Sequence, residues 1–181
     1  KTAYEIRPRD WSSDVCPSDL MEHVLAWSIP SLPDTAPRHM LGIGEPEDLF
    51  TCIRQGIDTF DCVAPTRHAR RGVLYTASGK LTITAARFRD DNRPVEPGCA
   101  CYCCREFSRA YLCHLFRAHE LLAYTLASIH NIHAIVSLVH GIRDAIRDDS
   151  LADMEREVIG AYRSHTEPAT PWSRLVHPSQ R

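Results

Sequence analysis

Four of the chain's 8 cysteines lie within six consecutive positions, and this run limits the possible structures more than any other stretch. It reads Cys99-Ala-Cys-Tyr-Cys-Cys104. Adjacent cysteines rarely bridge each other, because the geometry is strained. A C-x-C-x-x-C pattern with a histidine downstream suits tetrahedral Zn²⁺, which takes thiolate and imidazole ligands. The run therefore predicts a zinc site, and the alternative is a set of free or disulfide-bonded cysteines.

The predicted zinc site needs a fourth ligand, which spacing alone does not choose. The candidate histidines after the run include His114, His119, His130, His133 and His140. A helical histidine is more often solvated or packed than a metal ligand. Four protein ligands would leave no open coordination position, so such a site is structural and not catalytic. We therefore expect the catalytic residues elsewhere.

Composition limits the classes of partner. The chain has 181 residues, a formal net charge of -2, 44% apolar and 24% charged residues, which suits one domain with a core. The near-neutral balance argues against charge-driven RNA binding over the whole surface, so any RNA contact needs a local patch. No apolar run of transmembrane length and no signal-peptide order is visible. Clustered cysteines without a signal favour a reducing cytoplasm and no membrane contact.

Both ends of the chain lack a clear pattern. Residues 1–20 resemble translated sequencing-adapter sequence, so we exclude them from fold reasoning as a non-native segment, with Trp11 and Cys16 among them. The alternative is a natural flexible N-terminus. Residues 164–181 contain three prolines and little periodicity, which predicts a loose tail.

Between the ends, apolar periodicity predicts a mixed α/β chain. Residues 39–42, 45–55 and 57–63 read as strand, helix and buried strand, and hence as a parallel βαβ unit with a right-handed crossover. Residues 64–71 are expected to form a loop. The pattern further predicts a helix at 22–29, a hairpin of 73–76 and 80–84, a polar loop at 85–98, and helices at 108–119, 120–128, 134–146 and 151–162.

Asp61 lies at the end of the second predicted strand, with Asp58 three residues earlier. Active sites collect at the carboxyl ends of parallel strands. Asp61 is therefore a candidate nucleophile or general base. The alternative is a structural aspartate that caps the following loop.

The predicted loop after Asp61 is the densest basic patch of the chain, with Thr66, Arg67, His68, Arg70 and Arg71. Arginines bind phosphates and stack on bases, so the patch could contact RNA. The alternative is an ordinary solvated loop. A second, weaker signal is the turn Gly42-Ile-Gly44-Glu-Pro46, where the backbone could approach a phosphate or a base.

Four motifs in their order and spacing resemble the bacterial tRNA-guanine transglycosylase family. They are Gly56-Ile-Asp-Thr-Phe-Asp-Cys-Val-Ala-Pro-Thr-Arg67, the cysteine run, Ser108-Arg-Ala-Tyr-Leu112 and Ile129-His-Asn131. The resemblance covers residues 21–162. It implies a (β/α)₈ TIM barrel with an inserted zinc-binding subdomain. It also implies exchange of the wobble guanine of tRNA for a 7-deazaguanine base, expected to be 7-aminomethyl-7-deazaguanine, in queuosine biosynthesis.

The resemblance also assigns roles to residues. Asp61 would be the nucleophile that forms a covalent intermediate with the ribose, and Asp58 would be structural. One structural Zn²⁺ would be held by Cys99, Cys101, Cys104 and His130, with Cys103 not a ligand. The tRNA anticodon loop would be contacted by Thr66, Arg67, His68, Ala69 and Arg70, and by Gly42, Ile43, Gly44, Glu45, Pro46, Glu47 and Asp48. Full-length members of the family are expected to pair as homodimers.

Length is where the chain departs from this family. A TIM barrel needs about 250 residues, so we expect only its C-terminal portion. Residues 21–84 would hold barrel strands and helices with the catalytic and RNA-binding loop, and residues 85–163 the zinc-binding subdomain and the C-terminal helices. The family's acid/base aspartate and its guanine-recognition residues would lie in the missing part. We therefore expect this chain alone to be incomplete and inactive. The alternative function is a non-catalytic, zinc-stabilised RNA-binding or interaction module.

Overall fold

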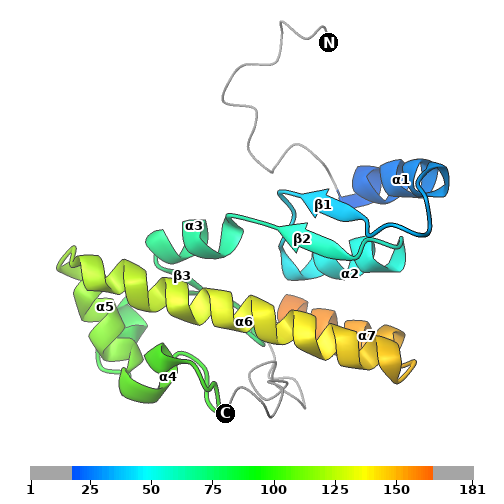
Figure 1. Cartoon of the computed structure of the whole chain (residues 1–181). Helices are drawn as coiled ribbons and strands as arrows, with labels where there is room; N and C mark the ends of the chain where they lie inside the picture. Colours follow the sequence, from blue (N-terminus) through cyan, green and yellow to red (C-terminus); the bar gives the residue numbers. More distant parts are fainter. Residues whose placement is uncertain (1–17, 165–181) are drawn as a thin grey trace, which may run out of the picture. The chain divides into compact units, whose positions relative to one another are not determined.

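A computed structural model describes residues 18–164, and the expectations for residues 1–17 and 165–181 lie outside that range. The chain divides after Cys62 into two units (Figure 1). Helix α1 begins at Ser18, so the last three residues of the segment expected to be non-native are helical.

The first unit contains the predicted strand–helix–strand motif. Figure 1 shows its two short strands side by side, and they pair in parallel, as the sequence predicted. The register places His39 opposite Thr59 and Leu41 opposite Asp61. The elements of the unit are α1 (Ser18–Ser28), η3 (Ile29–Ser31), β1 (His39–Leu41), α2 (Pro46–Arg54) and β2 (Thr59–Asp61).

Alternation along these strands sorts their side chains onto two faces. Met40 and Phe60, the middle residues, pack against a small core of Met21, Leu25, Cys52 and Ile57. The end residues of both strands are exposed and share the opposite face. The carboxylate of Asp61 is therefore presented on the face away from this core.

The second strand is shorter and less buried than the sequence predicted. The expected buried strand over 57–63 is only Thr59–Asp61, with an exposed residue at each end. The reason is the small sheet: within residues 18–164 the strands form two separate sheets of two strands each. Membership of these strands in a barrel stays a prediction.

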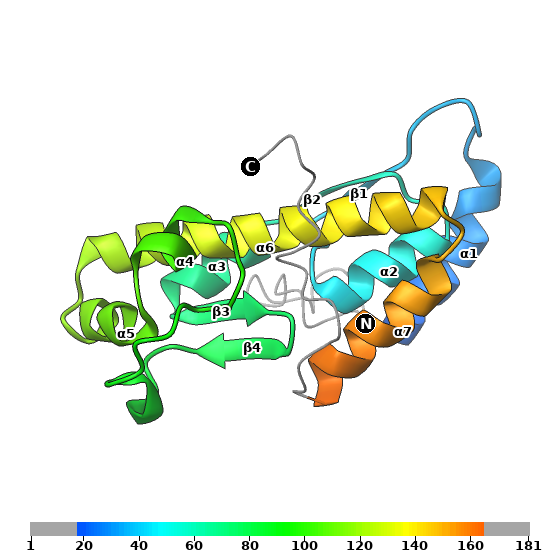
Figure 2. The ribbon, with the colours of Figure 1, turned by 90° about the horizontal axis from the view of Figure 1, so that it is seen from below.

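The second unit is built around one long helix, α6 (Leu121–Arg147). Figure 2 shows α7 returning beside the C-terminal half of α6, whereas α4 and α5 lie near its N-terminal half. Strands β3 and β4 form the predicted antiparallel hairpin. The other elements are α3 (Ala64–Arg70), β3 (Val73–Thr76), β4 (Gly79–Thr82), η4 (Ala86–Phe88), α4 (Tyr102–Glu106), α5 (Arg109–Arg117) and α7 (Leu151–Ser164).

The hairpin and the helices of this unit share one core. Leu74 and Ile83, at the hairpin, are fully buried in the same cluster as Leu112 of α5 and Leu126 of α6. The four cysteines of the run belong to this cluster as well. The cysteine run is therefore an internal feature of the unit and not a surface loop.

The prediction of a loop at 64–71 was wrong, because residues Ala64–Arg70 form helix α3. Pro65 occupies the first turn, where its missing N–H costs nothing. Pro65 and Ala69 are buried, four residues apart on one face, and α3 packs on α6 and β3. Tertiary packing thus stabilises this helix, although its many basic residues and short apolar face gave no helical pattern in the sequence.

Helix α6 is continuous where the sequence predicted two separate helices. The apolar pattern breaks at His130 and Asn131, yet both side chains are fully buried. By length and composition alone α6 could cross a membrane, which the apolar runs of the sequence did not predict. Its hydrogen bonds to β3 and α3 through these two buried residues are those of a core helix.

Candidate functional site

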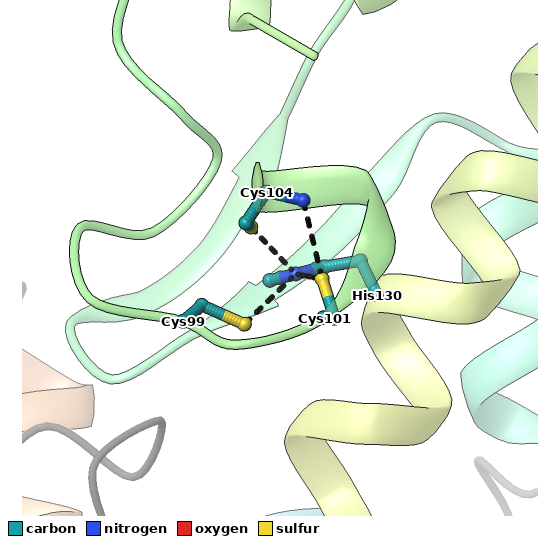
Figure 3. Close-up of side chains that lie close together, drawn as sticks. All are labelled: Cys99, Cys101, Cys104 and His130. Atoms are coloured by element: carbon teal, nitrogen blue, oxygen red, sulfur yellow. Dashed lines mark hydrogen bonds between the residues drawn. The ribbon is translucent and has the colours of Figure 1, made fainter. Parts of the chain in front are cut away.

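Cys99, Cys101, Cys104 and His130 come together in the second unit. Their potential ligand atoms all lie within 4.8 Å of one another, and all four residues are buried. The Nδ1 atom of His130 is 3.9 Å from the sulfur of Cys99, 3.6 Å from that of Cys101 and 3.3 Å from that of Cys104. Figure 3 shows the three thiols converging on the imidazole ring.

The spacing of the cysteines explains how they converge. Cys101 is the N-cap of α4, and its sulfur accepts a hydrogen bond from the backbone N–H of Cys104 at 3.3 Å. Cys99 precedes this turn, directly after Gly98, whose φ of 82° is in the left-handed region that glycine favours. A single helical turn and one glycine thus bring three thiols to one point.

His130 reaches the thiols from α6, and its ring is fixed by a backbone contact. Its Nε2 atom is 2.7 Å from the carbonyl oxygen of Tyr75 in β3. Because a carbonyl only accepts hydrogen bonds, Nε2 carries the proton and Nδ1 faces the sulfurs. An outer hydrogen bond of this kind commonly orients a histidine that binds a metal.

The thiols carry negative charge unequally. Hydrogen bonds from Cys104 and Cys99 lower the pKa of Cys101, and the same contacts with Cys101 raise the pKa values of Cys99 and Cys104. Burial lowers the pKa of His130, but its contacts with Cys101 and Cys99 outweigh this and raise the pKa to about 10. Three thiolates at this distance repel one another, so a cation is needed to hold all three.

This donor set fits a metal ion. Three sulfurs and one imidazole nitrogen are four ligands, which is the number of a closed tetrahedral site. Cys103 is fully buried but outside the group, and burial together with Cys101 and Cys99 raises the pKa of its thiol to about 12. His114, His119, His133 and His140 are also outside the group. The site could therefore hold one structural metal ion.

Asp61, the predicted nucleophile, lies in the first unit at the end of β2. Its side chain is 65% exposed, so it carries no cost of burying a charge. The backbone N–H of Gly42 donates to its Oδ1 atom at 3.2 Å and to its carbonyl oxygen at 3.0 Å. His39 Nε2 lies 3.4 Å from the same Oδ1 atom. Two neighbours from β1 and the turn after it thus orient the carboxylate.

The predicted RNA-contacting segment 42–48 begins at that same carboxylate. Gly42 has a φ of +76°, and a Cβ atom on Gly44 would lie 2.5 Å from Cys62 Cβ. Pro46, Glu47 and Asp48 form the first turn of α2. The structure therefore joins this segment to Asp61 within one unit, while its contact with RNA stays a prediction.

The other predicted RNA-contacting residues all lie on α3. Thr66, Arg67 and His68 are partly exposed and Arg70 is exposed, so their side chains are available to a ligand. Ala69 is fully buried in the core of the second unit. Its role is therefore to pack α3, and any contact of Ala69 with RNA would have to come from the backbone.

Sequence reasoning gave no role to three residues that the structure places at these sites. His39 contacts Asp61, and the parallel pairing of β1 with β2 could have indicated this. Asn131 hydrogen-bonds β3 and α3. Glu96, which is buried, accepts a hydrogen bond from the N–H of Ala77 at 2.8 Å, and burial raises its pKa. For the last two residues no sequence pattern signalled the contact.

The residues described above lie within the part of the chain that matches known proteins. The family model described as queuine tRNA-ribosyltransferase matches residues 13–164. A queuine tRNA-ribosyltransferase from Syntrophobacter fumaroxidans is 48% identical over 149 residues, which are 82% of this chain and 40% of that protein. One from Dictyoglomus turgidum is 39% identical over 165 residues, 88% of this chain and 42% of that protein.

A relative from Helicobacter pylori, also named queuine tRNA-ribosyltransferase, is 44% identical over 149 residues, 82% of this chain and 40% of that protein. The chain thus spans about 40% of the length of the curated relatives it matches. The family match covers both units, with the carboxylate of Asp61 in one and the buried cluster of cysteines and histidine in the other. The chain belongs to the queuine tRNA-ribosyltransferase family.

Proposed function

We propose that this chain is the C-terminal part of a tRNA-guanine transglycosylase, which exchanges the wobble guanine of tRNA for a 7-deazaguanine base. The match to the family model over residues 13–164 carries this proposal. The incoming base is expected to be 7-aminomethyl-7-deazaguanine, and the pathway queuosine biosynthesis.

In the proposed reaction Asp61 acts as the nucleophile. A carboxylate oxygen attacks the anomeric carbon of the ribose, and the bond from that carbon to guanine breaks with its electron pair leaving on the base. Guanine takes a proton from an acid in the part of the enzyme that this chain does not span. The deazaguanine, after losing a proton, then displaces Asp61, so two inversions retain the configuration.

The surroundings of Asp61 support this role. The carboxylate is exposed at the carboxyl end of a parallel strand, and the Gly42 N–H and His39 approach the same oxygen, Oδ1. Oδ2 is left for attack. Fixing a nucleophile before the substrate arrives reduces the entropic part of the activation free energy.

We assign tRNA binding to α3 and to residues 42–48. The side chains of Thr66, Arg67, His68 and Arg70 would contact the anticodon loop, because guanidinium and imidazole groups bind phosphates and stack on bases. The segment 42–48 offers backbone at the turn beside Asp61. We also expect the full-length enzyme to form a homodimer in the cytoplasm.

We propose Zn²⁺ as the metal of the cluster, because three thiolates and one imidazole are the ligands that structural zinc sites use. When bound, the ion would neutralise the thiolates and brace the second unit. Asp61 alone would carry the nucleophilic chemistry.

Trapping the covalent intermediate tests the assignment of Asp61. The enzyme, completed with the part of the relatives' length that this chain does not span, is mixed with substrate tRNA and quenched in denaturant. A covalent RNA–protein adduct is expected, and Asp61→Ala should abolish it. Asp58→Ala is the matched control and should keep it. An adduct that persists in Asp61→Ala would contradict the nucleophile assignment.

The second candidate function is a zinc-stabilised RNA-binding module without catalysis. The second unit favours it, because it combines its own core, the cysteine cluster and the basic helix α3 without Asp61. This alternative predicts RNA binding by the 181-residue chain and no adduct from the completed enzyme. Base exchange by the 181-residue chain alone would contradict it.

A further inference from the structure

Asn131, the residue after His130, uses its whole side-chain amide to join three elements. Its side chain is fully buried. Its Oδ1 atom accepts a hydrogen bond from the N–H of Tyr75 at 3.0 Å. Its Nδ2 group donates to the carbonyl oxygens of Pro65 and Val73, each at 2.9 Å. Oxygen facing an N–H and nitrogen facing two carbonyls fix the orientation of the amide.

These contacts link the cysteine cluster to α3. Adjacent residues of α6 hold Tyr75 at both of its backbone groups, with His130 bound to the carbonyl oxygen and Asn131 to the N–H. Asn131 also holds Pro65, in the first turn of α3. The orientation of His130 toward the thiols and the attachment of α3 therefore depend on the same turn of α6.

A second contact, between two aromatic rings, also joins β3 to α3. The ring of Tyr75 meets the ring of His68 edge to face, with 5.7 Å between centroids and an interplanar angle of 83°. His68 lies on α3, among the residues assigned to RNA. Tyr75 is therefore fixed by α6 through its backbone and supports α3 through its side chain.

Helix α3 needs such support, because it has only seven residues. Helices this short are not stable by themselves in water, so their geometry comes from packing. Only Pro65 and Ala69 of α3 are buried. The hydrogen bond from Asn131 to Pro65 therefore adds a directional attachment to the packing of the helix on α6 and β3.

We propose that Asn131 is a positioning residue through which a metal bound at the cysteine cluster holds α3 in the geometry that RNA requires. This inference rests on the proposed function only for the identity of the ligand, RNA. The attachment itself is a property of the second unit. RNA affinity should therefore depend on a metal that does not contact the RNA.

Hydrogen–deuterium exchange on the zinc-loaded 181-residue chain tests the attachment without any activity. Asn131→Asp keeps an acceptor for Tyr75 but removes both donated hydrogen bonds. We expect α3 amides to exchange about tenfold faster, because two hydrogen bonds are lost, while the Tyr75 amide stays protected. The matched control is Val158→Ala, which removes buried volume from α7. Val158→Ala should speed exchange in α7 and leave the exchange rates of the α3 amides at their wild-type values.

Metal removal gives the second measurement, which holds even if Asn131→Asp fails to fold. A chelator should raise exchange in β3 and α3 of the wild-type chain before it does so in α7. Unchanged α3 exchange in the folded variant, or equal increases in α3 and α7 after chelation, would overturn the proposal.

The RNA measurement separates this inference from the proposed function. The probe is an RNA stem-loop with guanine at the first anticodon position. Asn131→Asp and metal removal should each weaken its binding about tenfold, and Val158→Ala should not. Equal affinity of wild type and Asn131→Asp would overturn the inference. No binding to the wild type, with the exchange results as expected, would contradict the RNA role of α3 and leave its attachment to Asn131 established.

Discussion

The Nε2 atom of His130 lies 2.7 Å from the carbonyl oxygen of Tyr75. The histidine that faces three thiols is therefore also hydrogen-bonded to the backbone of β3. This hydrogen bond sets the tautomer that leaves Nδ1 for the sulfurs. It also means that the order of the hairpin and of the cysteine cluster should be lost together.

The ligand set predicts unequal effects of two neighbouring cysteines. Purified chain should contain about one zinc, and Cys101→Ser should lose it, because a serine hydroxyl is a poor substitute for thiolate. Cys103→Ser should keep it, since Cys103 is buried outside the group of four. Metal analysis of the two variants checks this. Loss of metal from Cys103→Ser with retention in Cys101→Ser would contradict the ligand set.

Asp91 should make the second unit sensitive to acid. Its side chain is only 9% exposed and accepts hydrogen bonds from Arg93 and Arg109. The bonds from Arg93 are the main cause that holds the pKa of Asp91 below its usual value. A lowered pKa stabilises the fold fully above the ordinary pKa of about 4, and this stability declines as the pH falls below about 4 and disappears only below the lowered pKa of the folded state.

Asp91→Asn should therefore lower the free energy of unfolding by about 2 kcal/mol at pH 7, and by a smaller amount at pH 3, where the unfolded chain already binds the proton. Asp153→Asn is the control, because Asp153 pairs with Arg156 in an exposed salt bridge with a side chain 77% exposed. Such pairs contribute little. Urea unfolding of each variant against wild type at both pH values gives the comparison. Equal effects of the two variants at pH 7 would refute the role of Asp91.

Two glycines should respond to alanine with opposite signs. In Gly44→Ala the new Cβ would lie 2.5 Å from Cys62 Cβ, so the turn beside Asp61 must shift. We expect a loss of about 2 kcal/mol from this overpacking. Gly160 has nothing within 4 Å of a Cβ and lies in α7, so Gly160→Ala should add about 0.5–1 kcal/mol through helix propensity.

Hydrogen exchange reports each unit separately, through α2 for Gly44→Ala and through α7 for Gly160→Ala. Wild-type protection of α2 in Gly44→Ala would show that the turn accommodates the methyl group. The close approach of Gly44 to Cys62 would then not require glycine.

Much of the second unit and of its site was predictable from sequence because local patterns determine it. The C-x-C-x-x-C spacing fits one helical turn capped by Cys101, and alternation at 73–82 gives the hairpin. The choice of His130 came from resemblance, since spacing left several histidines open. The structure agrees with it, because α6 brings His130 to the three thiols.

The errors arose where tertiary contacts outweigh local pattern. Helix α3 was predicted as a loop because its buried face is only Pro65 and Ala69. Helix α6 was predicted as two helices because His130 and Asn131 are polar residues in a buried turn. In both cases the missing information is the same hydrogen-bonded contact between Asn131, β3 and α3, which joins residues more than 50 positions apart.

The central claim is that Cys99, Cys101, Cys104 and His130 hold one metal ion, and X-ray absorption at the zinc edge tests it most directly. The predicted spectrum has three sulfur neighbours at about 2.3 Å and one nitrogen at about 2.0 Å. In His130→Cys the nitrogen should be replaced by a fourth sulfur. A wild-type spectrum with four sulfurs would indicate that Cys103, and not His130, is the fourth ligand. A spectrum with only nitrogen and oxygen neighbours would show that the metal is not bound by the cysteine cluster.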